Sequence, residues 1–159
     1  MITPSSTPSL LYYESASALI PTMTSNTTPS GIASASSDNV GTTLAWNAFA
    51  DSTDVPQWWY SDYPTSINEW VKYTFPSRMR VNRMTCYTIT VGGANTPIAF
   101  QYSMDDTIRN NIQTFNIITT NLVSVDISFP FIDAKYWRWY NEANSTYMGA
   151  TGLQLYGYK

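Results

Sequence analysis

The chain closes on two runs of alternating aromatic and aliphatic residues, Ala134-Lys135-Tyr136-Trp137-Arg138-Trp139-Tyr140 and Gly152-Leu153-Gln154-Leu155-Tyr156-Gly157-Tyr158-Lys159. Such residues suit a pleated surface that is buried on one side, so each run predicts a β-strand. A polar stretch through Tyr147 separates the two runs. We therefore expect the chain to end in a pair of aromatic strands.

Strand and turn signals also recur along the chain before these two C-terminal runs. In the run 70–75, alternation puts Val71, Tyr73 and Phe75 on one face, which predicts a half-buried antiparallel strand. The segment 43–50 instead predicts one or two helical turns. The expected strands are 32–35, 70–75, 81–91, 98–103, 113–119, 123–129, 136–140 and 153–158.

This pattern of eight or so short strands with turns between them predicts one all-β domain, a β-sandwich or jelly roll. A length of 159 residues allows such a domain to bury a core without disulfides. Charged residues are only 12% of the chain, about half the usual share, which is typical of β-rich extracellular or virion proteins. The net charge of -3 and the absence of a Lys/Arg cluster argue against a nucleic-acid partner.

The sequence divides into an arm and a body. Residues 1–22 are rich in Ser, Thr and Pro, so we expect an extended N-terminal arm that docks on a neighbour, followed by a β-sandwich domain over 23–159. No stretch resembles a membrane span or a signal peptide, so we expect synthesis in a cytoplasm without standard export.

Catalysis is disfavoured by composition. The chain contains no histidine, which excludes Ser-His-Asp and Cys-His nucleophile systems and histidine-ligated zinc. The lone Cys86 lies in a strand-like run and is expected to be a small buried hydrophobe. The adjacent acids Asp105 and Asp106 are typical of a solvated turn and not of a glycosidase pair. We expect no enzyme activity and no cofactor.

Five short motifs occur in order from about Thr24 to Tyr158. They are Ala45–Asp51 ahead of Trp58-Trp59, Glu69–Phe75, Phe100–Asp106, Ala134–Arg138 and Leu153–Gly157.

This ordered set resembles a discoidin domain, also called coagulation factor 5/8 type C, a family that includes family 32 carbohydrate-binding modules. The segment 18–26 is similar to the lead-in of such modules in bacteriophage tail and fibre proteins. The resemblance implies an eight-stranded antiparallel jelly-roll β-sandwich, galactose-binding-domain-like, that binds ligands in loops at one end and has no catalytic role.

Sugar recognition needs aromatic rings for the apolar face of a pyranose and fixed polar groups for its hydroxyls. The loop 58–63 holds more rings than one core position needs. Trp58 matches the structural tryptophan of the family, which leaves Trp59, Tyr60 and Tyr63 as candidate carbohydrate contacts. The alternative is that these rings pack in the core.

Two further loops carry candidates. Asn95 matches an asparagine of the galactose binders, although a turn residue with positive φ is the alternative. Asn144 and Tyr147 lie before the last strand, where the family often has a stacking aromatic, and a packed loop tyrosine is the alternative there.

Two departures separate the chain from the galactose binders. The arginine position of the family falls on Thr90 or Val91 and no histidine exists, so galactose specificity is not expected. The family's calcium glutamate is replaced by Gly152, so we expect no metal unless Asp51 and Asp54 re-form the loop.

The resulting hypothesis is a virion-associated carbohydrate-binding module, on a phage tail, neck or head, that adheres to host or environmental glycans. The arm would anchor it to other virion proteins, as a homo-oligomer or in several copies. One alternative is a structural decoration or adaptor protein that uses the fold only as a scaffold. Another is an accessory binding module of a larger glycosidase.

Overall fold

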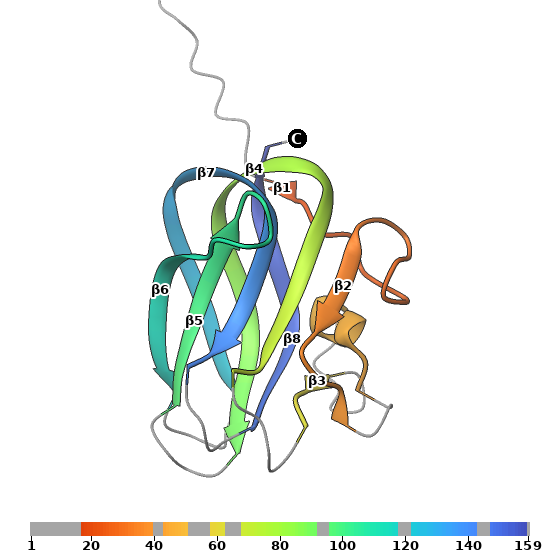
Figure 1. The fold of residues 1–159 in the computed structure, drawn as a ribbon, viewed down its shortest axis with the longest axis vertical. Coiled ribbons are helices and arrows are strands. Elements are labelled where there is room, and N and C mark those ends of the chain that lie inside the picture. The colour runs from red at the N-terminus through yellow and green to blue at the C-terminus, as the bar shows by residue number, and fades with distance from the viewer. Residues whose placement is uncertain are drawn as a thin grey trace, which may run out of the picture.

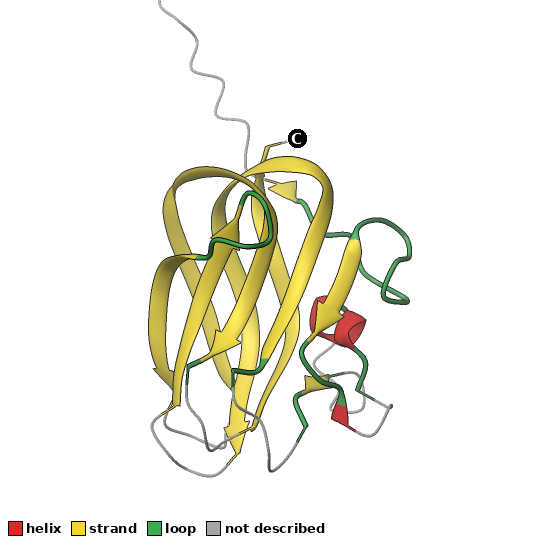
Figure 2. Ribbon diagram, in the orientation of Figure 1, coloured by secondary structure: helices red, strands yellow, loops and turns green. Residues whose placement is uncertain are grey.

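The architecture is seen in a computed structural model of the chain. It describes residues 17–39, 43–50, 58–62, 68–91, 96–117, 122–142 and 147–158, without the side chains of 89–91 and 147. Strands dominate these residues, with short 3₁₀ segments beside them (Figure 2).

The elements follow the chain in the order of Figure 1. They are β1 (Ser17–Ala18), β2 (Ile32–Ala35), the 3₁₀ helix η2 (Ala45–Phe49), β3 (Trp59–Tyr60), β4 (Trp70–Val91), β5 (Thr96–Ser103), β6 (Asn110–Ile117), β7 (Val123–Asn141) and β8 (Tyr147–Tyr158).

Two long strands, β4 and β7, join the two layers of the fold. They pair antiparallel along their lengths, and their register shifts between Thr74 and Met79 and again between Val81 and Arg83. Both strands arch over the same end of the molecule in Figure 1. Because each strand bends there, one hydrogen-bonded sheet folds over into two facing layers.

The first layer has the strand order β2, the first half of β4, the second half of β7, β5 and β6. The second layer contains the first half of β7, the second half of β4, and β8, with the short β1 and β3 paired to β8. This arrangement confirms the predicted all-β antiparallel sandwich.

The bend of β4 differs from the sequence prediction, which separated 70–75 from 81–91. The two runs are parts of one strand, and the bend between them carries the exposed residues Pro76, Ser77 and Arg78. Proline lacks a backbone donor and breaks a regular ladder, so its presence indicated an interruption. The chain bends there and continues as a strand in the opposite layer.

The core between the layers is aromatic. Val71, Tyr73 and Phe75 are buried at 3% exposure or less, which confirms the predicted alternation of this strand. Trp137 and Trp139 of β7 are also fully buried, and the Phe100 ring stacks on Trp137 at 5.7 Å between centroids. Each such ring buries about 150–250 Å² of mostly apolar surface, which makes these residues the main source of stability.

Cys86 lies in this core, as the sequence predicted. Its side chain is 2% exposed, and burial raises the pKa of its thiol well above the usual range. The thiolate is the reactive form of cysteine, so this residue is chemically inert.

The predicted arm begins to pack against the domain earlier than expected. Ser17 and Ala18 pair with β8, and the next residues Leu19 and Ile20 are buried in the core at 6% and 2% exposure. The Gln154 side chain donates to the Ile20 carbonyl at 2.6 Å and accepts from its N–H at 2.9 Å. Residues 17–20 therefore belong to the sandwich, which corrects the boundary expected at residue 22; residues 1–16 lie outside the described chain.

The turn between β5 and β6 is organised by Asp105. Its carboxylate accepts hydrogen bonds from the N–H groups of Thr107 and Ile108 at 2.9 and 3.0 Å, and these bonds hold its pKa well below the usual range. A carboxylate with a lowered pKa stabilises the fold above its unfolded pKa of about 4, and that contribution is lost as the pH falls.

We predict that Asp105→Asn lowers stability at neutral pH and makes the free energy of unfolding less dependent on pH between about 4 and 2. Urea unfolding followed by circular dichroism at several pH values measures both effects. Asp133→Asn, an exposed site on β7, is the control. An unchanged pH profile for Asp105→Asn would contradict the role assigned to this carboxylate.

Candidate functional site

Several strand ends meet at the end of the sandwich opposite the β4 and β7 bends (Figure 1). Val91 at the end of β4 pairs with Tyr147 at the start of β8, and Tyr60 of β3 pairs with Gly149. The described residues that flank the three predicted binding loops are gathered at this end, as the resemblance implies. The segments 63–67, 92–95 and 143–146, which include parts of these loops, lie outside the described chain.

Half of the six predicted contact residues fall in those segments. The structure therefore tests Trp59 and Tyr60, and it places only the backbone of Tyr147, in β8. The predicted residues that lie outside the described chain are Tyr63, Asn95, Asn144, Asp51 and Asp54.

Trp59 is a core residue, which corrects its prediction as a carbohydrate contact. Its side chain is 0% exposed, and its indole N–H donates to the Ser37 carbonyl at 2.9 Å. A ring must be accessible to stack on a sugar, and this one has no accessible face. The alternative reading, in which the ring packs in the core, is the correct one for this residue.

Tyr60 remains a candidate at this end. It is partly exposed, and its ring stacks on Trp58 with centroids 5.9 Å apart and planes 18° apart. Trp58 itself is 3% exposed, as expected for a structural tryptophan. A buried tryptophan thus supports the Tyr60 ring from behind and fixes its orientation.

The segment that carries Tyr60 is held firmly against its neighbours. Ser61 exchanges two hydrogen bonds with the backbone of Met148, at 3.0 and 3.1 Å. The Ser37 hydroxyl donates to Glu69 at 2.5 Å and accepts from the Asp62 N–H at 2.9 Å. Fixed backbone of this kind lets a binding residue keep its geometry before a ligand arrives.

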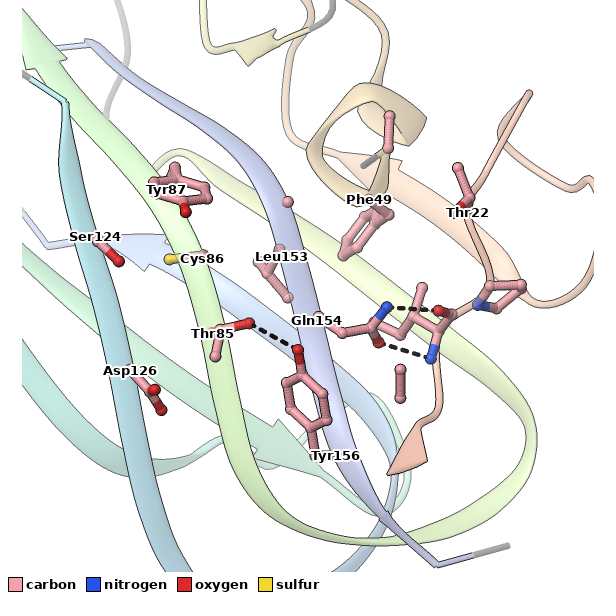
Figure 3. Close-up of a pocket in the computed structure, with 15 residues that line it drawn as sticks. Thr22, Phe49, Thr85, Cys86, Tyr87, Ser124, Asp126, Leu153, Gln154 and Tyr156 are labelled. Atoms are coloured by element: carbon pink, nitrogen blue, oxygen red, sulfur yellow. Dashed lines mark hydrogen bonds between the residues drawn. The ribbon is translucent and has the colours of Figure 1, made fainter. Parts of the chain in front are cut away.

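The structure also contains a surface hollow that the sequence did not predict. A hollow of about 720 Å³ lies on the outer side of the second layer, between β7 and β4 on one side and the N-terminal segment on the other (Figure 3). We call it the sheet groove. Its lining includes Thr85 and Tyr87 of β4, Ser124 and Asp126 of β7, Gln154 and Tyr156 of β8, and Ile20, Pro21 and Phe49 on the opposite wall.

Polar groups in the sheet groove are fixed by neighbours. Arg83 donates to both Asp126 oxygens at 2.8 Å, and these hydrogen bonds lower the pKa of the Asp126 carboxyl. The same guanidinium lies 4.7 Å from the centre of the Tyr156 ring. The Thr85 and Tyr156 hydroxyls are 3.5 Å apart. These groups form a polar strip across three neighbouring strands.

An irregularity of β8 shapes this groove. Thr85 of β4 pairs with Gln154 and Tyr87 pairs with Thr151, so β8 has one extra residue between them. Gly152 lies in this bulge with φ of 58°, in the left-handed region that glycine adopts without strain. An isolated glycine in a strand pattern is the sequence signal that indicates such a bulge.

Metal binding has no support among the described residues. They contain no group of three or more His, Cys, Asp or Glu side chains. At Gly152, where the resemblance implies a glutamate, the Tyr87 ring lies 3.3 Å from the position that a Cβ would take. The proposed remnant at Asp51 and Asp54 lies outside the described chain, so the expectation of no metal stays a prediction.

None of the helical segments in the described part of the chain has the length and apolar character that a membrane span requires.

Comparison with known proteins rests on structure. No family model and no curated protein sequence matches the chain. Among solved structures, the chitosan-binding module 1 derived from a chitosanase/glucanase of Paenibacillus sp. IK-5 is 23% identical, with a TM-score of 0.63 over 80% of this chain and 95% of that chain.

Two other solved structures carry bound sugars. The family 32 carbohydrate-binding module of Clostridium perfringens NanJ, in complex with galactose, is 15% identical, with a TM-score of 0.63 over 80% of this chain and 93% of that chain. A His 62 mutant of the lectin binding domain of Lectinolysin, complexed with Lewis b, is also 15% identical. Its TM-score is 0.64 over 87% of this chain and 100% of that chain.

These similarities define the class of fold. The sandwich is the galactose-binding-like β-sandwich found in family 32 carbohydrate-binding modules and in lectins. At these identities the likeness extends to the architecture, and function must be argued from the sites themselves.

Proposed function

We propose that the chain is a non-catalytic carbohydrate-binding module. The observation that carries this proposal is that the strand ends next to the three predicted loops lie close together beside Tyr60. The Tyr60 ring is supported there by the ring of Trp58. An aromatic ring beside loops rich in Asn, Ser and Tyr has the chemistry that a pyranose requires. The names of the structural neighbours, which include a chitosan-binding module and lectin domains, support the same function.

We further propose that the module is displayed on a phage virion and adheres to host or environmental glycans. Support comes from the charge-poor composition, 12% charged residues, and from the resemblance of 18–26 to the lead-in of phage tail modules. Because 17–20 belong to the sandwich, the anchor to other virion proteins is assigned to residues 1–16. Several copies on one particle would add avidity to weak single sites.

A scaffold role as a decoration or adaptor protein is the second candidate. It is favoured by apolar side chains that remain exposed on this chain, since such residues often pack against a neighbouring subunit. Ile108 is 68% exposed, Ile32 is 51% exposed and Leu122 is 46% exposed. These residues are dispersed over different elements, which makes this candidate weaker than the binding module.

A glycan array tests the proposed function. We expect the wild type to bind one or more glycans, and Tyr60→Ala and Tyr147→Ala to weaken that binding by about tenfold or more because a stacking ring is removed. Phe131→Ala is the matched control, since its ring is 42% exposed but lies in the bend of β7, at the opposite end. A folded wild type that binds no glycan would favour the scaffold.

A further inference from the structure

We propose that the sheet groove is a second binding site, separate from the loop end, and that it takes a neutral oligosaccharide with Tyr87 as the stacking ring. The hollow of about 720 Å³ is within the range of about 300–1,000 Å³ that is usual for small-ligand sites. It lies on the face of the second layer, whereas Tyr60 lies at its end.

The Tyr87 ring is placed as a platform. Its side chain is 38% exposed, and it lies on β4 where the pairing with β8 becomes irregular. The ring lies over the bulge at Gly152, where a Cβ would be 3.3 Å from Cδ2 and 3.8 Å from Cε2. The missing side chain of this glycine thus lets the ring rest against β8. Bulges often re-aim a side chain in this way beside a binding site.

Hydrogen-bonding groups for sugar hydroxyls lie beside this ring on the same sheet, on β7, β4 and β8 (Figure 3). Asp126 is 52% exposed, and its carboxylate is oriented by two hydrogen bonds from Arg83. A carboxylate has about four lone-pair sites, so two remain for a ligand. The hydroxyls of Thr85 and Tyr156 are also in the lining and are able to donate or accept.

The charge of the groove favours a neutral ligand. Asp126 is held in its charged form by Arg83, and the guanidinium donors Nε and Nη2 of Arg83 are engaged by the same carboxylate. An acidic sugar would meet this carboxylate on a chain of net charge -3. On the opposite wall, Pro21 is partly exposed beside the buried Ile20 and Phe49, and its ring is able to contact the C–H face of a sugar.

The test is NMR titration of the isotope-labelled full chain with neutral hexasaccharides of glucose, mannose, galactose, xylose and N-acetylglucosamine. We expect one or more of them to shift the backbone amides of the groove residues, and Tyr87→Ala to weaken that binding by about tenfold or more. Tyr87→Phe should retain most of the affinity because the ring is kept. Phe131→Ala, an exposed ring on the same β7 strand that carries Asp126, should leave it unchanged.

A second variant tests the position of the Tyr87 ring without removing the ring. Gly152→Ala introduces a Cβ against Tyr87 and should weaken binding in the groove, while a melting curve shows that the fold is retained. Tyr60→Ala should leave the groove shifts unchanged. If the shifts are confined to residues 60–62 and 148–149, the groove proposal is wrong and the proposed function stands. If none of the hexasaccharides shifts a groove amide, the groove proposal is likewise overturned.

Discussion

Gly157→Ala is expected to destabilise the sandwich strongly. A Cβ at this position would lie 1.9 Å from the Arg80 carbonyl oxygen and 2.8 Å from its carbon. These are backbone atoms, so no side-chain rotation relieves the clash. Gly157 pairs with Val81 on one side and with Ser17 on the other, which fixes β8 between two strands.

The cost should reach or exceed the upper part of the usual range for overpacking, about 3 kcal/mol, because β4 and β8 must separate. Urea unfolding followed by circular dichroism measures this loss. Gly152→Ala is the matched control in the same strand, since its Cβ meets only the Tyr87 side chain and its main cost is a left-handed φ, about 1–2 kcal/mol. Equal losses for the two variants would contradict the assigned clash.

The fold was predictable because its strongest signals are local. Alternation in 70–75 and 136–140 reports directly which side of a strand is buried, and both runs are strands that pair with each other in the first layer. The bend that joins 70–75 to 81–91 was not predictable, because it depends on where β7 bends alongside it. Periodicity identifies strands but does not show whether two consecutive strands are continuous.

The N-terminal boundary was missed for a related reason. Ser17 and Ala18 pair with Gly157 and Tyr156, which are far away in the sequence. A composition rich in Ser, Thr and Pro describes local flexibility, and it contains no information about a distant edge that is able to accept a strand. The sheet groove was also missed, because it forms only when the N-terminal segment packs beside β8.

The candidate site shows the limit of reading single residues. Trp58 and Trp59 are adjacent, and strict alternation would bury one and expose the other. Both are buried, at 3% and 0% exposure, because β3 is only two residues long and the chain departs from a regular strand there. The sequence identified the cluster of rings but assigned Trp59, a core ring, to the surface.

Trp59→Ala is the second large effect that we predict. The side chain is fully buried in the core cluster, and truncation of a large aromatic residue in such a site costs about 3–5 kcal/mol. Trp59→Phe should cost less, because most of the buried surface is kept and the chief loss is the hydrogen bond to the carbonyl of the partly exposed Ser37, worth about 0.5–1.5 kcal/mol. Urea unfolding of both variants measures the two contributions.

The comparison of Trp59→Ala with Tyr60→Ala separates a core role from a binding role. Tyr60 is partly exposed, so its truncation should change glycan affinity with little change in the free energy of unfolding. Trp59 has no accessible face, so its truncation should lower stability strongly, and any folded fraction should bind with nearly normal affinity. If Trp59→Ala instead kept its stability and lost binding, the ring would have to reach the surface, contrary to its burial and to its bond with Ser37.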